Sequence, residues 1–190
     1  MRTTLSAEQT SFFSKNGFIE FAIAPKELFA LLHPGRDLWR KEPLLKQFII
    51  KTLAPIALTL SGKKQVRVAC DQMMEGENRP TKKAPLKELF SIQGFIMGAI
   101  IAQNPIIPTR RSPLGIIPLP AAPENILFFK PELILDWPVV KSDCYLVLFS
   151  APNAVYIHNG KDPHTNYLKP FGYSFGDTLK NEFHPLILSS

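Results

Sequence analysis

Two histidines, His158 and His164, are the first candidates for chemistry, because they stand six residues apart in the aromatic-rich stretch "AVYIHNGKDPHTNYLKPFGYSF". An imidazole can bind a metal ion or transfer a proton near neutral pH. Cys70 and Cys144 lie far apart, with no CxxC pair and no Cys/His quartet, so a structural zinc site is not expected. The two histidines are therefore either metal ligands or polar residues of a loop.

Motifs of other enzyme classes are missing from the sequence. It has no Gly-rich phosphate loop, no nucleophile elbow and no HExxH motif. No Ser or Cys stands beside a His and an acid at a recognisable spacing, which excludes a nucleophilic hydrolase. His33 and His184 each precede a proline and belong to no such constellation.

The elements that must position these residues change from helices to short strands along the chain. Ser6 and Gln9 match a capping box ahead of a short helix that Gly17 ends, and further helices are predicted over 26–33 and after Asp37. After these come β-rich segments separated by Pro, Gly and Asn turns: "QVRVACD", "LFSIQGFIMGAIIAQ", "PLGIIPLP", "NILFFKPELIL", "CYLVLFSA", "AVYIH", "PFGYSFGD" and "FHPLILS". This order predicts an α+β, mainly β protein with a sandwich or jelly-roll body.

Composition and charge narrow the class of protein further. The 190 residues can form a core of their own, and the 18 prolines favour loops and strand ends over a helical bundle. The N-terminus has no apolar signal core, and the run "GFIMGAIIA" is too short to cross a bilayer. We therefore expect a cytoplasmic protein with no membrane partner. The net charge of +6 comes from short basic clusters, which indicate a solvated surface, and nucleic acid is not an expected partner.

Three stretches resemble a known family of oxygenases. They are "LSAEQTSFFSKNGFIEF", "SPLGIIPLP" and "CYLVLFSAPNAVYIHNGKDPHTNYLKP". They are similar to the opening helix, a proline-rich turn and the distal-histidine segment of phytanoyl-CoA dioxygenase-like members of the Fe(II)/2-oxoglutarate-dependent oxygenase superfamily. The chain also resembles a small, divergent family from obligate intracellular bacteria that is related to these oxygenases in fold. The resemblance implies a double-stranded β-helix (jelly roll) with N-terminal helices.

The resemblance also implies a site in which two histidines and one carboxylate hold Fe(II) and leave room for 2-oxoglutarate and O₂. Asp71 matches the carboxylate of the family's H-x-D pair, but Ala69 stands where the first histidine would be. His158 matches the distal iron ligand. Lys169, eleven residues later, matches the basic anchor of 2-oxoglutarate, and Asn166 falls near the family's asparagine. His164 is then a loop residue rather than a ligand.

The expected organisation is one double-stranded β-helix domain over residues 1–190, mainly helical over 1–55 and mainly β barrel over 56–190. Because the triad is incomplete, we expect the iron chemistry to be lost or altered and the barrel to bind a small anionic ligand or a protein. Asp71 and His158 would then be a buried pair joined by a hydrogen bond, and Lys169 a surface lysine. Two alternatives stay open: an active non-haem iron hydroxylase with an incomplete triad, and a metal-dependent DNA-binding regulator.

Overall fold

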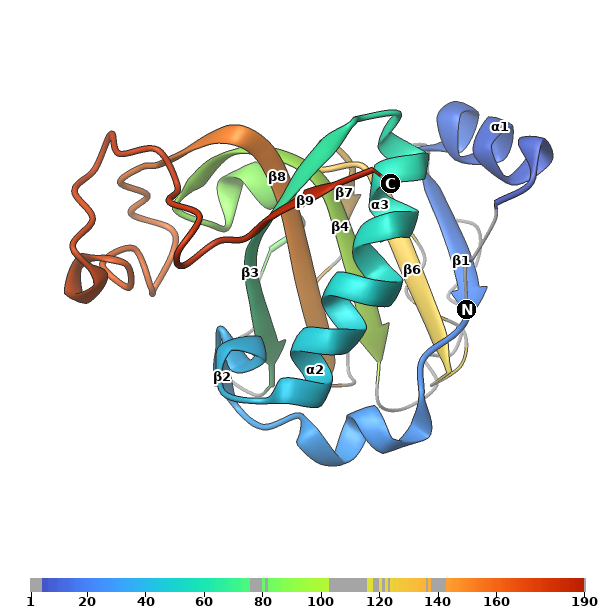
Figure 1. Ribbon diagram of the computed structural model, residues 1–190, viewed down its shortest axis with the longest axis horizontal. Helices are drawn as coiled ribbons and strands as arrows, with labels where there is room; N and C mark the ends of the chain where they lie inside the picture. Colours follow the sequence, from blue (N-terminus) through green and yellow to red (C-terminus); the bar gives the residue numbers. More distant parts are fainter. Residues whose placement is uncertain are drawn as a thin grey trace.

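One large antiparallel sheet organises the chain (Figure 1). The computed structural model describes residues 5–75, 80, 82–102, 116–117, 120, 122, 124–135, 137 and 143–189. Within them, seven strands pair in the order β1-β6-β4-β8-β3-β2, with β9 also on β3, and β5 and β7 form a small parallel sheet. The strands are β1 (Phe18–Ala22), β2 (Gly35–Arg36), β3 (Gln65–Met74), β4 (Ile92–Ala102), β5 (Ile116–Ile117), β6 (Asn125–Phe129), β7 (Ile134–Leu135), β8 (Cys144–Tyr156) and β9 (Leu186–Leu188).

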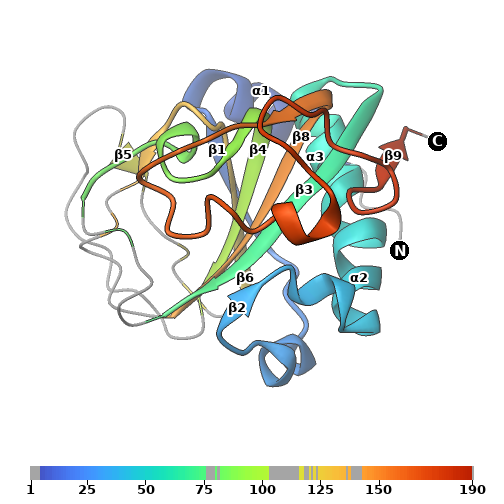
Figure 2. The same ribbon diagram turned by 90° about the vertical axis from the view of Figure 1, so that its left-hand side faces the viewer.

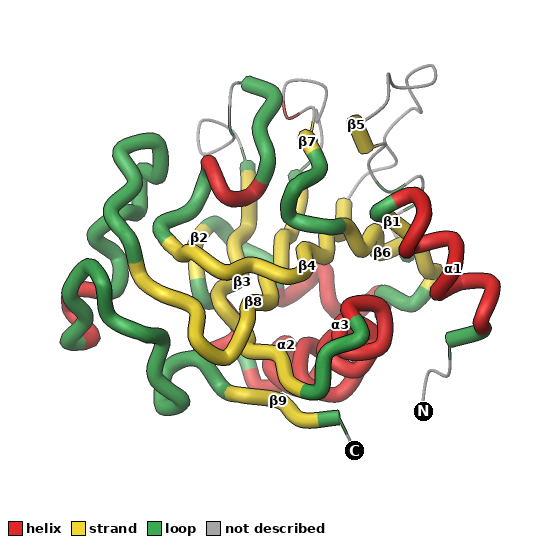
Figure 3. The backbone as a smooth tube through the Cα atoms, turned by 90° about the horizontal axis from the view of Figure 1, so that it is seen from above, coloured by secondary structure: helices red, strands yellow, loops and turns green. Residues whose placement is uncertain are grey.

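Helices cover one face of the large sheet, and loops with the small sheet cover the other (Figure 3). The α-helices are α1 (Ala7–Asn16), α2 (Pro43–Phe48) and α3 (Ala54–Ser61). A π-helical segment, η3 (Ile49–Leu53), joins α2 to α3. Pro55 explains this wider turn, because proline lacks the N–H that an α-helix would use and its ring crowds the carbonyl one turn earlier. Short 3₁₀-helices occur at η1 (Lys26–Leu31), η2 (Leu38–Arg40), η5 (Leu86–Glu88) and η7 (Lys169–Phe171).

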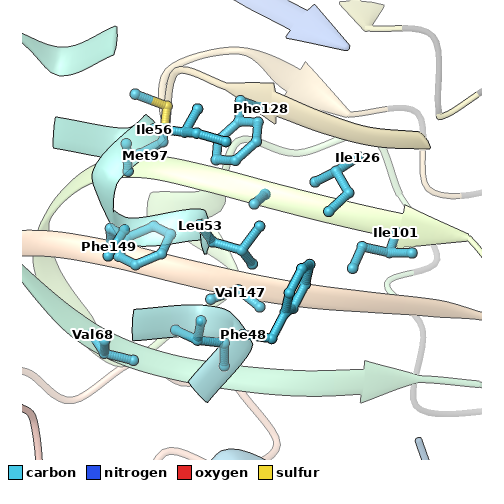
Figure 4. Packing of buried hydrophobic residues seen from close by; sticks show 14 of the residues in the cluster. Phe48, Leu53, Ile56, Val68, Met97, Ile101, Ile126, Phe128, Val147 and Phe149 are labelled. Atoms are coloured by element: carbon cyan, nitrogen blue, oxygen red, sulfur yellow. The ribbon is translucent and has the colours of Figure 1, made fainter. Parts of the chain in front are cut away.

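The helix-side core lies between the segment α2–η3–α3 and the sheet (Figure 4). Phe48, Leu53 and Ile56 pack there against sheet residues such as Val147 and Phe149. The segment Pro43–Ser61 is the one helix of the described chain long and apolar enough to cross a membrane by length and composition, and half of it is buried in the protein. Apolar side chains of this segment therefore pack in the helix-side core.

The loop-side core contacts the opposite face of the sheet. It contains Leu146 and Leu148 of β8 together with Phe129 and Trp137, all at most 2% exposed. Gly98 on β4 is opposite Phe129 on β6, where an added Cβ would come within 2.3 Å of the ring. The inner side of the sheet on this face is thus filled by large apolar side chains.

The segment after β8, orange to red in Figure 2, runs through loops and η7 before β9 returns to the edge of β3. Arg67 of β3 holds this segment in place. Its buried guanidinium donates hydrogen bonds to the carbonyls of Pro152 and His184 and to the side chain of Asn181. The chain end is therefore anchored to the same strand that carries Asp71.

The structure confirms several local predictions and corrects others. The capping box of Ser6 and Gln9 is present, and Gly17 adopts the left-handed conformation at φ 78°. The segments "CYLVLFSA" and "AVYIH" form the continuous strand β8 rather than two strands, because Pro152 and Asn153 are accommodated within it. The stretch "PFGYSFGD" is not a strand but a 3₁₀ end followed by turns.

Candidate functional site

Asp71 lies on the central part of β3 and is fully buried. Its Oδ2 accepts hydrogen bonds from the Trp39 backbone N–H, at 3.0 Å, and from the Tyr145 hydroxyl. Burial raises the pKa of the Asp71 carboxyl to about 7, although the bond from Tyr145 opposes the shift. Both partners belong to the helix-side core. Asp71 therefore connects β3 to β8 and to the η2 turn.

Ala69 and Asp71 do not share a face of β3. The register of β3 against β8 shifts between Val68 and Cys70, so a β-bulge interrupts the alternation of side chains. Ala69 and Cys70 both belong to the loop-side core, whereas Asp71 bonds to helix-side residues. The period-two argument that places an H-x-D pair on one face does not hold at this bulge.

His158, Asn166 and Lys169 are all exposed. The structure brings two of them together on the ring of Phe175: the His158 ring lies edge-on with centroids 5.3 Å apart, and the Lys169 ammonium lies 4.7 Å from the centroid. The backbone carbonyl of Asn166 accepts a hydrogen bond from the backbone N–H of Lys169, at 3.1 Å. The expected hydrogen bond between Asp71 and His158 is wrong, because one side chain is buried in the helix-side core and the other is at the surface.

A cluster of potential metal ligands was the next feature to look for among the residues that the structure describes. Among them, no group of three or more His, Cys, Asp or Glu side chains comes together. Ala69 borders a cavity of about 10 Å³ that His164 and Tyr156 also line, which is about the space of one water molecule. The assignment of Asp71 and His158 as iron ligands stays a prediction.

A buried ion pair that the sequence did not reveal lies on the loop side of β3. Arg36 of β2 donates two hydrogen bonds to the Asp162 carboxylate, at 3.0 and 3.2 Å, and two to Gln72 Oε1, at 3.0 and 2.8 Å. Asp162 also accepts the backbone N–H groups of Ser91 and His164. Arg36 in β2 and Asp162 in the loop after β8 are 126 residues apart, so no spacing signal in one sequence could pair them.

Above this ion pair opens a cavity of about 460 Å³, which we call the basic cavity. Its described lining includes four cations, Arg36, Lys82, Lys83 and Lys161, and two carboxylates, Glu88 and Asp162. The excess of positive charge suits an anionic molecule. Lys169 and Asn166 are not among its lining residues.

His184 is a further residue whose position the sequence did not indicate. Its imidazole is fully buried, and Nδ1 lies 2.8 Å from the carbonyl of Ala69. Burial and the nearby Arg40 lower the pKa of His184 to about 3, so the ring is neutral at physiological pH. Such a ring can donate to the Ala69 carbonyl, and it anchors the C-terminal segment at the bulge of β3.

Comparison with solved structures identifies the fold. No protein-family model and no curated protein sequence matches the chain. SnoK, a non-heme α-ketoglutarate-dependent carbocyclase of nogalamycin biosynthesis, matches with a TM-score of 0.68 and 16% identity over 97% of each chain. The chain has the jelly-roll fold of Fe(II)/2-oxoglutarate-dependent oxygenases.

Two further oxygenase structures agree with this fold. The epimerase SnoN of nogalamycin biosynthesis matches with a TM-score of 0.65 and 12% identity over 94% of this chain and 96% of SnoN. EctD from S. alaskensis with bound Fe matches with a TM-score of 0.53 and 12% identity over 77% of each chain. The predicted α+β, mainly β jelly roll is therefore confirmed, and at these identities the likeness concerns the fold alone.

Proposed function

We propose that this protein is an oxygenase-fold binding protein that has lost the iron chemistry of the fold and binds a small anionic ligand. The observation that carries the proposal is the structure of β3 around the bulge. Asp71 accepts hydrogen bonds there from residues of the helix-side core. Ala69 lies on the other face and stands where the family resemblance would require a histidine. A carboxylate and a histidine at these two positions would point away from each other.

The filling of the loop-side core supports the same proposal. Iron and 2-oxoglutarate would need an open volume lined by polar donors on this face of the sheet. In the described chain, the face instead carries apolar side chains such as Phe129, Leu146 and Leu148, none of them more than 1% exposed. The basic cavity, which lies beyond this core, offers the charge and the space that a small anion needs.

Restoring the missing histidine tests whether the iron site is only one residue short. We expect Ala69→His to lower the free energy of unfolding by about 1–3 kcal/mol, since the imidazole must enter a packed region beside a cavity of about 10 Å³. We expect no gain of Fe(II) binding, because Asp71 stays on the opposite face. Denaturant unfolding and anaerobic Fe(II) titration measure the two effects. A stable variant that binds one Fe(II) would contradict the proposal.

The two alternatives from the sequence have different outcomes. Nothing in the described part of the chain supports the DNA-binding regulator. The fold of this chain is that of the oxygenases. DNA binding by neutralisation of phosphates would show a steep dependence on salt concentration. The active hydroxylase with an incomplete triad shares this fold, and the iron titration that closes the Discussion separates it from the binding protein.

A further inference from the structure

Arg36, Gln72 and Asp162 form the base of the basic cavity, and the ion pair among them has used almost all of its hydrogen-bonding capacity. The Asp162 carboxylate accepts two hydrogen bonds from Arg36 and two from backbone N–H groups, at 2.8–3.2 Å. A carboxylate offers about four such positions, so Asp162 has none left for a ligand. Arg36 donates four of its five N–H groups, two to Asp162 and two to Gln72. The ion pair is therefore a fixed support.

Gln72 of β3 is the residue of this base that still has free hydrogen-bonding groups. Its Oε1 accepts hydrogen bonds from Nε and Nη2 of Arg36, at 3.0 and 2.8 Å. A guanidinium has donors only, so this contact fixes which end of the amide faces Arg36 and turns Nε2 away from it. Gln72 is 5% exposed and lines the cavity, and its Nε2 has no hydrogen-bond partner among the described residues. The base thus presents a buried amide with two free N–H donors.

Free donors beside filled acceptors determine which ligand this base can recognise. The N–H groups of Gln72 Nε2 can only donate, whereas Gln72 Oε1 and the Asp162 carboxylate already accept their full number of bonds. A buried donor gains most from a charged oxygen, since such a hydrogen bond is about twice as strong as a neutral one. Met74 and Phe90, at 3% and 1% exposed, offer a ligand almost no apolar surface. Recognition at the base therefore depends on the oxygen atoms of the ligand.

Lys82 supplies positive charge beside these donors. It is exposed, lines the cavity, and has no hydrogen-bond or ion-pair partner among the described residues. Lys161 also lines the cavity, but its Nζ lies 3.0 Å from Glu88, so its charge is matched. An exposed ammonium is a hydrated point charge on a flexible stem and attracts an anion without a fixed geometry. One unmatched lysine suits a ligand with a single negative charge.

We propose that the basic cavity binds a small, polar monocarboxylate. One carboxylate oxygen accepts hydrogen bonds from Gln72 Nε2, and Lys82 balances the charge. This inference rests on the proposed function in taking the protein as a binding protein for a small anion. It adds the chemical class of the ligand, and it makes Gln72 the residue that selects an acceptor over a donor.

The side-chain amide of Gln72 is the direct readout, followed by ¹H–¹⁵N NMR of the metal-free protein and assigned through the bonds of the side chain. Lactate is the probe. Lactamide and 1-amino-2-propanol keep its carbon skeleton but carry a neutral amide or an ammonium in place of the carboxylate. We expect lactate to shift both Gln72 N–H peaks along a saturable curve, lactamide to bind at least about tenfold more weakly, and 1-amino-2-propanol to leave the peaks in place. Gln72 peaks that lactate does not move, or that lactamide moves equally well, would overturn the proposal.

Gln72→Glu removes the donors within a side chain of nearly the same shape. The glutamate still accepts hydrogen bonds from Arg36, but it places an acceptor oxygen where Nε2 donates. We expect lactate binding, followed by backbone amide peaks around the cavity, to weaken about tenfold or more. Lys82→Ala should weaken it about twofold to fivefold, and this loss should shrink at about 0.5 M salt because exposed charges are screened. Unchanged affinity in Gln72→Glu would overturn the role of Gln72.

A matched control adds the same negative charge elsewhere on β3. Gln65 is exposed at the start of the strand and is not among the lining residues of the cavity. We expect Gln65→Glu to bind lactate within about twofold of the wild type. Equal weakening in the two glutamate variants would overturn the proposal, because it would mean attraction by net charge alone.

The lactate titrations and the iron titration give independent answers. Lactate binding is measured without metal, and Fe(II) binding is measured in a separate anaerobic sample. Iron binding would overturn the proposed loss of iron chemistry, while the Gln72 peaks would still decide the class of ligand. Failure of lactate to bind would overturn the ligand class and leave the iron result unaffected.

Discussion

Replacing Asp71 by alanine is expected to lower the free energy of unfolding at pH 5 by about 2–4 kcal/mol in the metal-free protein. The carboxyl bonds the Trp39 N–H and the Tyr145 hydroxyl inside the helix-side core. Removing it leaves both donors buried without their partner, and each such group costs about 1–3 kcal/mol. Urea unfolding followed by circular dichroism at pH 5 measures the loss.

A second aspartate provides the control for this prediction. Asp177 also accepts a backbone hydrogen bond, from Ser174 at 2.7 Å, but at the surface. We expect Asp177→Ala to cost less than about 1 kcal/mol. An iron ligand behaves differently from a structural carboxyl, because removing a ligand from a metal-free site is often neutral or stabilising. A stable Asp71→Ala protein would therefore contradict the structural role given to Asp71.

The pH dependence of the free energy of unfolding should reveal two buried groups, Asp71 and His184, whose contributions change with pH in opposite directions. The pKa of Asp71 is raised to about 7 in the fold, so the folded chain keeps this proton between about pH 4 and 7 while the unfolded chain has lost it. Stability from Asp71 is present at low pH and falls as the pH rises through this window, with a slope of about 1.4 kcal/mol per pH unit. Burial also raises the pKa of Asp37, which acts in the same direction.

The contribution of His184 to stability changes with pH in the opposite direction. Its pKa is lowered to about 3, so between about pH 3 and 6.5 the unfolded chain binds a proton that the folded chain does not. Stability from His184 is present above pH 6.5 and falls as the pH falls toward 3. Between pH 4 and 6.5 the effects of Asp71 and His184 largely cancel in the wild type.

Single substitutions separate the two effects. The stability of Asp71→Asn relative to the wild type should rise by about 1 kcal/mol per unit from pH 4 to 7, because only the wild type loses stability from Asp71. His184→Asn retains a donor for the Ala69 carbonyl, and its stability relative to the wild type should rise as the pH falls from 6.5 to 4. Urea midpoints at half-unit pH steps measure both slopes. Parallel curves for the wild type and Asp71→Asn would show that Asp71 titrates at its ordinary pKa.

Local chemistry in the sequence predicted the elements that depend on neighbouring residues. The Ser6 capping box and Gly17 set the ends of α1, and the alternation in "QVRVACD" predicted β3. The bulge in β3 has no comparable signal. It depends on the pairing of β3 with β8, and it reverses which face Ala69 takes relative to Asp71. The resemblance to the oxygenases predicted the fold that the comparison confirms.

The basic cavity and the buried Arg36–Asp162 ion pair beside it could not be predicted from one sequence for a related reason. Arg36 and Asp162 are two ordinary charged residues, and in the sequence each has many possible partners along the chain. Only the fold places β2 beside the loop after β8 and buries the pair. His184 precedes a proline, in a stretch of the sequence where exposure is the usual expectation. In the fold, Arg67 donates a hydrogen bond to the His184 carbonyl, and the imidazole lies buried beside the Ala69 carbonyl of β3.

The most direct test of the central claim is an anaerobic titration of the metal-free protein with Fe(II) and 2-oxoglutarate, followed by visible absorption. In an iron oxygenase of this fold the two bind together and give a charge-transfer band. Our account predicts no band and no retained iron, under conditions in which an active oxygenase gives both. A band that appears in the wild type and is lost in Asp71→Asn and in His158→Ala would contradict it, and would show that these residues hold iron.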